Sequence, residues 1–181
     1  MTTKHPAAPP RPILTRAAEN GVLLGAIIGA MVLAMGLSTV FPAAALLLWG
    51  GTLAMPFITY RMLRRSAVAS GGTSGFPEIW AEGIASYFLG SLIPALIAYV
   101  SLRFFAPTFI ADTVNSSIAI LESQGADYAM MADTLRQAAA AKMPTATDVA
   151  AQLISFNIIA GTALSLIVAI PVSLTTRRRT A

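Results

Sequence analysis

Four long apolar stretches without a charged residue restrict this chain to a small set of folds. They span residues 21–40, 43–60, 83–102 and 153–172. A bilayer core about 30 Å thick is crossed by roughly 20 residues of α-helix, and each stretch approaches that length. Only helices and closed barrels satisfy the backbone in hydrocarbon, and continuous apolar runs favour helices. We therefore expect an all-α membrane protein, a bundle of four transmembrane helices.

Composition excludes several other classes of protein. Hydrophobic residues make up 56% of the 181 residues and charged residues only 11%, whereas soluble domains carry about 25% charged residues. A soluble enzyme, a coiled coil and a disordered chain are thus excluded. With no cysteine and one histidine, His5, the chain lacks a disulfide framework, a thiolate or histidine-cluster metal site and a Ser-His-Asp triad. We expect no catalytic residue, no metal and no cofactor.

The apolar pattern and the flanking residues set the expected boundaries. We expect a disordered cytoplasmic tail over residues 1–20, a membrane domain over 21–175 and a basic tail over 176–181. Within the domain, helices are expected at about 21–41, 43–63, 78–105 and 147–175, with an outer helical loop over 107–144. Only Phe41 and Pro42 separate the first two helices, so these should form an antiparallel hairpin.

Basic residues predict the orientation. Three lie in each of the N-terminal tail, the second connection and the C-terminal tail, against three on the other side, Arg103, Arg136 and Lys142. Because Lys and Arg accumulate on the cytoplasmic side, both termini are expected in the cytoplasm. The same rule accounts for the basic clusters, so a nucleic-acid site is not needed to explain them. Contact with anionic lipid headgroups is a weaker additional role of these clusters. The lipid bilayer is therefore the expected partner.

The outer loop between the third and fourth apolar stretches is predicted to form two short amphipathic helices. The first stripe consists of Ile110, Val114, Ile118 and Leu121, and the second of Tyr128, Met131, Leu135 and Ala138. Their spacings of three and four residues are typical of packing faces. Gly125 is expected to separate the helices, and Thr145 with Asp148 to cap the fourth membrane helix. Tyr128, Met130, Met131 and Met143 form either an adaptable binding face or, as we favour, a packing face.

Small residues predict tight helix packing in two of the apolar stretches. Gly21, Gly25 and Gly29 lie four apart in the first stretch, and Gly161 and Ser165 begin a similar row in the fourth. Missing side chains let two helix backbones approach closely in lipid. The two rows face each other, or one of them faces a second protomer; the pattern leaves this open.

Three polar residues near or within the apolar stretches are candidates for function. Glu78 and Glu82 lie one turn apart at the start of the third stretch, and Asn157 lies within the fourth. Carboxylates there form either a proton or cation site or, as we favour, interfacial anchors in headgroup water at a helix N-terminus. On that reading, replacing both with Gln leaves stability nearly normal. Asn157 is expected to bond a neighbouring helix through Ser86, Tyr87 or Ser91.

Three motifs make the chain resemble a known family. They are Tyr60-Arg61 followed by Gly71-Gly72-Thr73-Ser74-Gly75-Phe76, the third stretch ending in Phe104-Phe105-Ala106-Pro107, and the acidic Met-containing loop before a final Gly/Ser-rich helix. From Ala18 to Arg179 the chain is similar to the domain-of-unknown-function family 4199. The resemblance implies four membrane helices and residence in a bacterial inner membrane, and it offers no catalytic residue.

Three functions remain open. We favour a structural or regulatory membrane component that acts through its small-residue faces and outer helices, with a second copy or another membrane protein as partner. The alternative is a subunit of a small-solute or ion transporter or channel. A membrane enzyme has the least support, because no nucleophile–base pair or ligand set lies near a membrane face.

Overall fold

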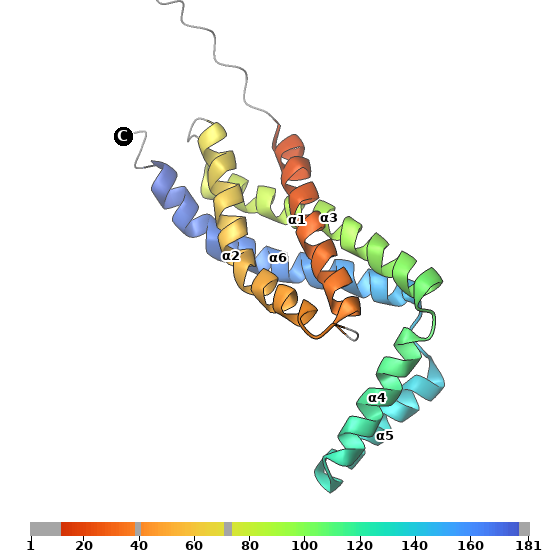
Figure 1. Ribbon diagram of the computed structural model, residues 1–181. Helices are drawn as coiled ribbons and strands as arrows, with labels where there is room; N and C mark the ends of the chain where they lie inside the picture. Colours follow the sequence, from red (N-terminus) through yellow and green to blue (C-terminus); the bar gives the residue numbers. More distant parts are fainter. Residues whose placement is uncertain (1–11, 39–40, 71–73, 178–181) are drawn as a thin grey trace, which may run out of the picture. The chain divides into compact units, whose positions relative to one another are not determined.

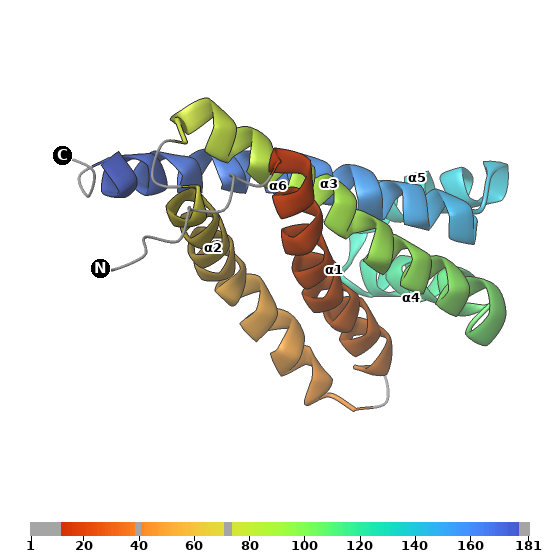
Figure 2. The ribbon, with the colours of Figure 1, turned by 90° about the horizontal axis from the view of Figure 1, so that it is seen from above.

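The computed structural model describes residues 12–38, 41–70 and 74–177, and all regular structure in these ranges is helical. The helices are α1 (Ile13–Leu37), α2 (Ala44–Ala69), α3 (Phe76–Val100), α4 (Phe109–Ser123), α5 (Ala126–Ala141) and α6 (Ala146–Arg177), and a short π-helix, η1 (Ser101–Phe105), continues α3. They are shown in two views in Figures 1 and 2. The chain divides into two compact units, residues 1–94 with 154–181, and residues 95–153.

Three of the described helical stretches are long and apolar enough to cross a membrane: Ile13–Leu37, Phe76–Phe105 and Ala146–Thr176. Helix α2 has 26 residues but is not among them. Its last third carries Arg61, Arg64 and Arg65, and glycines, a threonine and a proline interrupt its apolar part. The expectation of membrane-crossing helices is thus confirmed for three of the four apolar stretches.

Helix α1 begins earlier than the sequence predicted. Pro12 is its N-cap, and the backbone N–H of Thr15 donates to the Pro12 carbonyl at 3.1 Å. Residues 13–20 are therefore helical, and the expectation of a disordered tail up to residue 20 is wrong over this stretch. The physical reason is that Arg16 is buried and that Arg16 and Asn20 both bind Glu82 of another helix, as described below. Residues 1–11 and 178–181 lie outside the described part.

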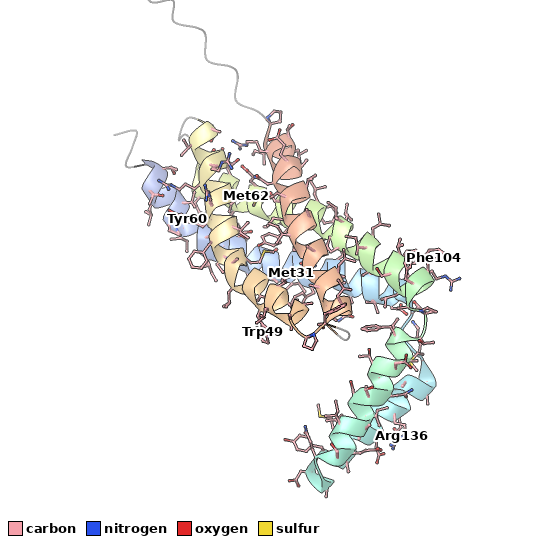
Figure 3. The ribbon with its side chains drawn as sticks, in the orientation of Figure 1. Met31, Trp49, Tyr60, Met62, Phe104 and Arg136 are labelled. Carbon is pink, nitrogen blue, oxygen red and sulfur yellow. The ribbon has the colours of Figure 1, made fainter. Side chains whose placement is uncertain are left out.

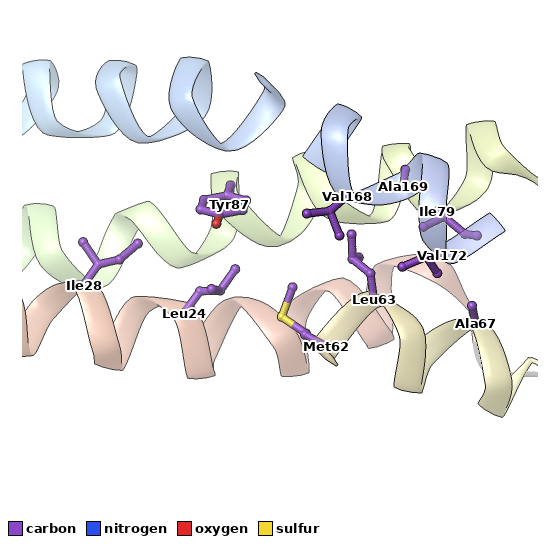
Figure 4. Packing of buried hydrophobic residues seen from close by; sticks show 10 residues of the cluster. All are labelled: Leu24, Ile28, Met62, Leu63, Ala67, Ile79, Tyr87, Val168, Ala169 and Val172. Carbon is purple, nitrogen blue, oxygen red and sulfur yellow. The ribbon is translucent and has the colours of Figure 1, made fainter. Parts of the chain in front are cut away.

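The first unit packs parts of α1, α2, α3 and α6 around one apolar cluster. Its buried members come from all four helices and include Leu24, Met62, Ile79 and Val168, which converge in Figure 4. Leu24 and Leu63 are almost fully buried. In the same unit Met31 of α1 lies against Gly51 of α2, where a Cβ would stand 2.7 Å from the Met31 sulfur; Figure 3 labels this methionine.

The small residues of α1 are contact points for α3. A Cβ on Gly21 would lie 3.0 Å from the Ser86 carbonyl oxygen, and one on Gly25 would lie 2.6 Å from the Gly90 carbonyl oxygen. Gly29 is buried as well. The α6 row also meets α3: Gly161 lies under the Tyr87 ring, and Ser165 lies against Gly83. Each row therefore faces α3, and the two rows do not face each other at these contacts.

The second unit contains the helical hairpin of α4 and α5. Gly125 joins the two helices with a φ of 103°, a left-handed conformation that favours glycine. Ile118 and Ala132 are the buried residues of the hairpin, and the expected α4 stripe is its shielded face. Thr145 and Asp148 form the expected cap, since the Thr145 N–H donates to Asp148 at 2.9 Å and the Asp148 N–H donates to Thr145 at 3.2 Å.

The packing face of α5 differs from the sequence prediction. Its shielded positions are Ala132, Leu135 and Ala139, whereas Tyr128 and Met131 are exposed. Small alanines let α5 lie close to α4, and this advantage outweighs the larger apolar area of methionine and tyrosine. The described structure therefore leaves the Tyr128, Met130 and Met131 side chains outside the hairpin contact, with Met130 82% exposed.

The α1–α3 contact predicts a size limit at Gly25. We expect Gly25→Ala to lower stability by about 1–3 kcal/mol, because the added methyl overpacks the contact with the Gly90 carbonyl. Gly50→Ala is the matched control: a Cβ there meets nothing within 4 Å, and alanine is the better helix former. Thermal unfolding in mild detergent measures both. Equal melting temperatures for Gly25→Ala and Gly50→Ala would contradict the close approach of the two backbones.

Candidate functional site: a buried polar cluster on Glu82

Glu82 of α3 is the centre of a buried polar cluster in the first unit. Its side chain is 3% exposed, although it lies within the apolar stretch Phe76–Phe105. A carboxylate in such surroundings is costly unless it is paired and hydrogen-bonded. Its partners come from α1 and α2, so the cluster joins three helices.

Helix α1 supplies the positive charge. Arg16 Nη2 lies 3.1 Å from Glu82 Oε2, and the Arg16 side chain is 10% exposed. One turn later, Asn20 Nδ2 donates a hydrogen bond to Glu82 Oε1 at 3.0 Å. The spacing of four residues places Arg16 and Asn20 on one face of α1. The next residue, Gly21, lets α1 come close to α3.

Helix α2 completes the cluster with a hydroxyl. Ser66 Oγ donates to Glu82 Oε1, and Ser66 is itself buried. Both carboxylate oxygens of Glu82 are therefore bound by side chains of the protein. The Nε of Arg16 is buried without a hydrogen-bond partner among the described residues. The arrangement is chemically an ion pair reinforced by neutral donors.

A second polar pair lies one turn deeper along α3. The hydroxyls of Tyr87 and Thr59 are 2.7 Å apart and buried, which links α3 to α2. Ser86 and Ser91 instead donate to carbonyls of their own helix, those of Glu82 and Phe88, at 2.7 Å. These bonds satisfy hydroxyls locally, as serine commonly does inside helices.

Glu78 and Glu82, which lie one helical turn apart in the sequence, have different surroundings. Glu78 is exposed, as expected for an interfacial residue in the first turn of α3. Glu82 is not, and the expectation that headgroup water stabilises it is wrong. Four residues further along the helix, its side chain is enclosed by α1 and α2. Sequence reasoning missed Arg16, Asn20 and Ser66 as its partners.

Two other candidates from the sequence, Asn157 and Ser165, are also buried, but they are not among the partners of the Glu82 carboxylate. Asn157 is 8% exposed, and its expected bonds to Ser86, Tyr87 or Ser91 stay a prediction. Ser165 Oγ is buried without a partner among the described residues and lies against the backbone of Gly83. Trp80 Nε1 donates to the Thr162 carbonyl at 3.4 Å, which ties α3 to α6.

In the described ranges, no group of three or more His, Cys, Asp or Glu side chains lies close enough to hold a metal ion. The Glu82 cluster has one carboxylate, one guanidinium, one amide and one hydroxyl. Such a set can hold helices together or take part in proton exchange.

Comparison with known proteins identifies the family. The family model described as "Protein of unknown function (DUF4199)" matches residues 19–173, so the chain belongs to this family, as the sequence resemblance indicated. The match takes in Asn20, Ser66 and Glu82, whereas Arg16 precedes it. No curated protein and no solved structure matches the chain.

The cluster predicts unequal effects of the two carboxylates. We expect Glu82→Gln to cost about 3–5 kcal/mol of stability, because it leaves the Arg16 guanidinium buried without a counter-charge. Glu78→Gln has the same chemistry at an exposed position and should change stability by about 0.5 kcal/mol or less. Thermal or denaturant unfolding in detergent compares them.

A double variant tests whether the ion pair is the cause. Arg16→Met removes the opposite charge, so the loss in Arg16→Met/Glu82→Gln should be clearly smaller than the sum of the two single losses. Strict additivity of the two substitutions, or equal stability of Glu82→Gln and Glu78→Gln, would contradict the cluster.

Proposed function

We propose that the protein is a structural or regulatory component of a bacterial inner membrane. In this role its four-helix core serves as a rigid support for a partner protein or a second copy of the chain. The observation that carries the proposal is the closure of the Glu82 cluster: Arg16, Asn20 and Ser66 occupy both carboxylate oxygens. A carboxylate bound in this way stabilises one arrangement of α1, α2 and α3.

Surface chemistry supports α2 as the fourth membrane helix. Leu46, Trp49, Leu53 and Phe57 are 67–75% exposed, and their spacings of three and four residues place them along one side of α2. An exposed apolar stripe of this length is costly in water and is suited to lipid. The basic residues Arg61, Arg64 and Arg65 then follow at the membrane boundary, where arginine and lysine are usual.

We further propose that both termini are cytoplasmic and that the α4–α5 hairpin faces the opposite side. The distribution of basic residues supports this orientation. The hairpin is suited to protein contacts: Met130 and Met131 are exposed at 82% and 63%, and flexible thioethers adapt to varied apolar surfaces. Copurification with a partner, lost on Met130→Glu/Met131→Glu but kept on Glu78→Gln, would support this function.

A transporter or channel subunit is the second candidate, because Glu82 lies in an apolar stretch where ionisable residues often serve transport. The two functions differ in what the carboxylate does. In a transporter Glu82 must exchange partners during each cycle, whereas in a support it stays bound to Arg16. A pH-driven flux in proteoliposomes that Glu82→Gln abolishes, and that Glu78→Gln leaves intact, would place transport first.

Absence of cysteine allows a direct test of topology. We expect a single Cys at Ser123 to react with an impermeant thiol reagent outside intact spheroplasts, and a Cys at Ser70 to react only after lysis. A Cys at Leu53 should react poorly in both conditions, since lipid would surround it. Labelling of Ser70→Cys from outside would show that the orientation is the opposite one. Ready labelling of Leu53→Cys would show that α2 does not lie in the membrane.

A further inference from the structure

The second unit contains a hollow where two of the apolar helical stretches end. Phe76–Phe105 ends there and Ala146–Thr176 begins there. The lining comes from the end of α3, from η1, from the start of α4 and from the connection between α5 and α6. On the membrane placement proposed above, the hollow lies at the lipid–water boundary.

The hollow has a lining of both apolar and polar surface and a single charged side chain. Apolar atoms come from residues such as Leu102, Ile110 and Met143, hydroxyl groups from Tyr99, Thr145 and Thr147, and the charge from Arg103. A ligand complementary to this lining has an apolar part and an anionic head. A fully polar anion would leave the apolar wall uncovered, and an uncharged lipid would leave the guanidinium without its counter-charge.

Charge pairing in this unit distinguishes Arg103 from the other basic residues. Arg136 binds Glu122 and also Asp133, the latter at 2.6 Å. Lys142 lies 3.7 Å from Asp148. Arg103 forms no ion pair with any residue of the described ranges, although acidic side chains are frequent in residues 95–153. An exposed guanidinium kept away from nearby carboxylates is available to an outside anion.

Local backbone structure explains why Arg103 takes this position. Residues 101–105 form the π-helix η1, which follows α3 directly and ends at the C-cap Ala106; π-helical turns are frequent at functional sites. Arg103 lines the hollow, whereas the adjacent Phe104 and Phe105 are 69% and 82% exposed. Exposed aromatic rings next to an arginine are suited to the interfacial region of a bilayer.

From these observations we propose that the hollow at Arg103 binds the phosphate head of an anionic phospholipid. The guanidinium donates two hydrogen bonds to the phosphate oxygens, as arginine commonly does. The start of the acyl chains covers the apolar part of the lining. This inference rests on the proposed membrane placement, but it concerns a site distinct from the Glu82 cluster.

Lipid titration of the full chain in mild detergent tests the proposal. We expect phosphatidylglycerol to bind and raise the melting temperature. Phosphatidylcholine with the same acyl chains should bind at least about tenfold more weakly, because its choline opposes the guanidinium and its net charge is zero. Inorganic phosphate should neither stabilise the protein nor displace the lipid. Native mass spectrometry counts the bound lipid in each case.

Three variants separate the charge from the cavity. Arg103→Gln should weaken phosphatidylglycerol binding about tenfold, and Arg103→Lys should fall between it and the unchanged protein. Ala111→Trp fills the hollow, keeps Arg103 and should weaken binding as well. Arg136→Gln is the control, since it removes the same charge in the same unit from a side chain that is already paired.

Several outcomes would overturn the inference. Unchanged lipid binding by Arg103→Gln, or an equal loss in Arg136→Gln, would show that the charge of Arg103 is not the determinant. Equal binding of the two phospholipids would reduce the site to an apolar contact, and displacement by inorganic phosphate would make it a site for free anions. Because topology is measured by thiol labelling, a failure of the membrane placement is distinguishable from a failure of this site.

Discussion

Burial of the Glu82 carboxylate is the constraint on which the first unit depends. A charge removed from water must be compensated within the protein, and here compensation requires Arg16, Asn20 and Ser66 together. These residues belong to α1 and α2, so the complete set of bonds to Glu82 forms only when three helices are assembled. Its net contribution to stability is modest, since desolvation offsets much of the attraction. We infer that its main effect is specificity, because a misplaced helix leaves a buried charge unpaired.

Close backbone contact and the polar cluster depend on each other. Gly21 and Gly25 bring α1 within reach of α3, and only at that distance can Arg16 and Asn20 meet Glu82. Conversely, the ion pair selects which face of α1 lies against α3. A small-residue row by itself does not determine its partner. In this bundle the charge at one end of the helix decides it.

Local sequence signals predicted most elements, whereas contacts between distant residues were not predictable. Gly125 and the Thr145–Asp148 cap act over a few residues, so sequence alone places the ends of α4, α5 and α6 well. Burial of Glu82 depends on Arg16 and Asn20, more than sixty residues away, which lie where polarity suggested a tail. Their spacing of four residues just before the Gly21 row was the available signal. The prediction of the α5 packing face was wrong because it was based on the spacing of the larger apolar side chains, whereas α5 packs through alanines.

Tyr87 seated on Gly161 has a consequence for motion along the helix axes. The ring occupies the space that a side chain at residue 161 would fill. If α6 slid past α3 by one helical turn, Asn157 or Ser165 would arrive beneath the ring, and both carry side chains that do not fit there. The contact therefore fixes one axial register between α3 and α6, and it opposes sliding of one helix along the other at this point. A rearrangement of α6 against α3 is therefore expected to involve tilting or separation of these two helices.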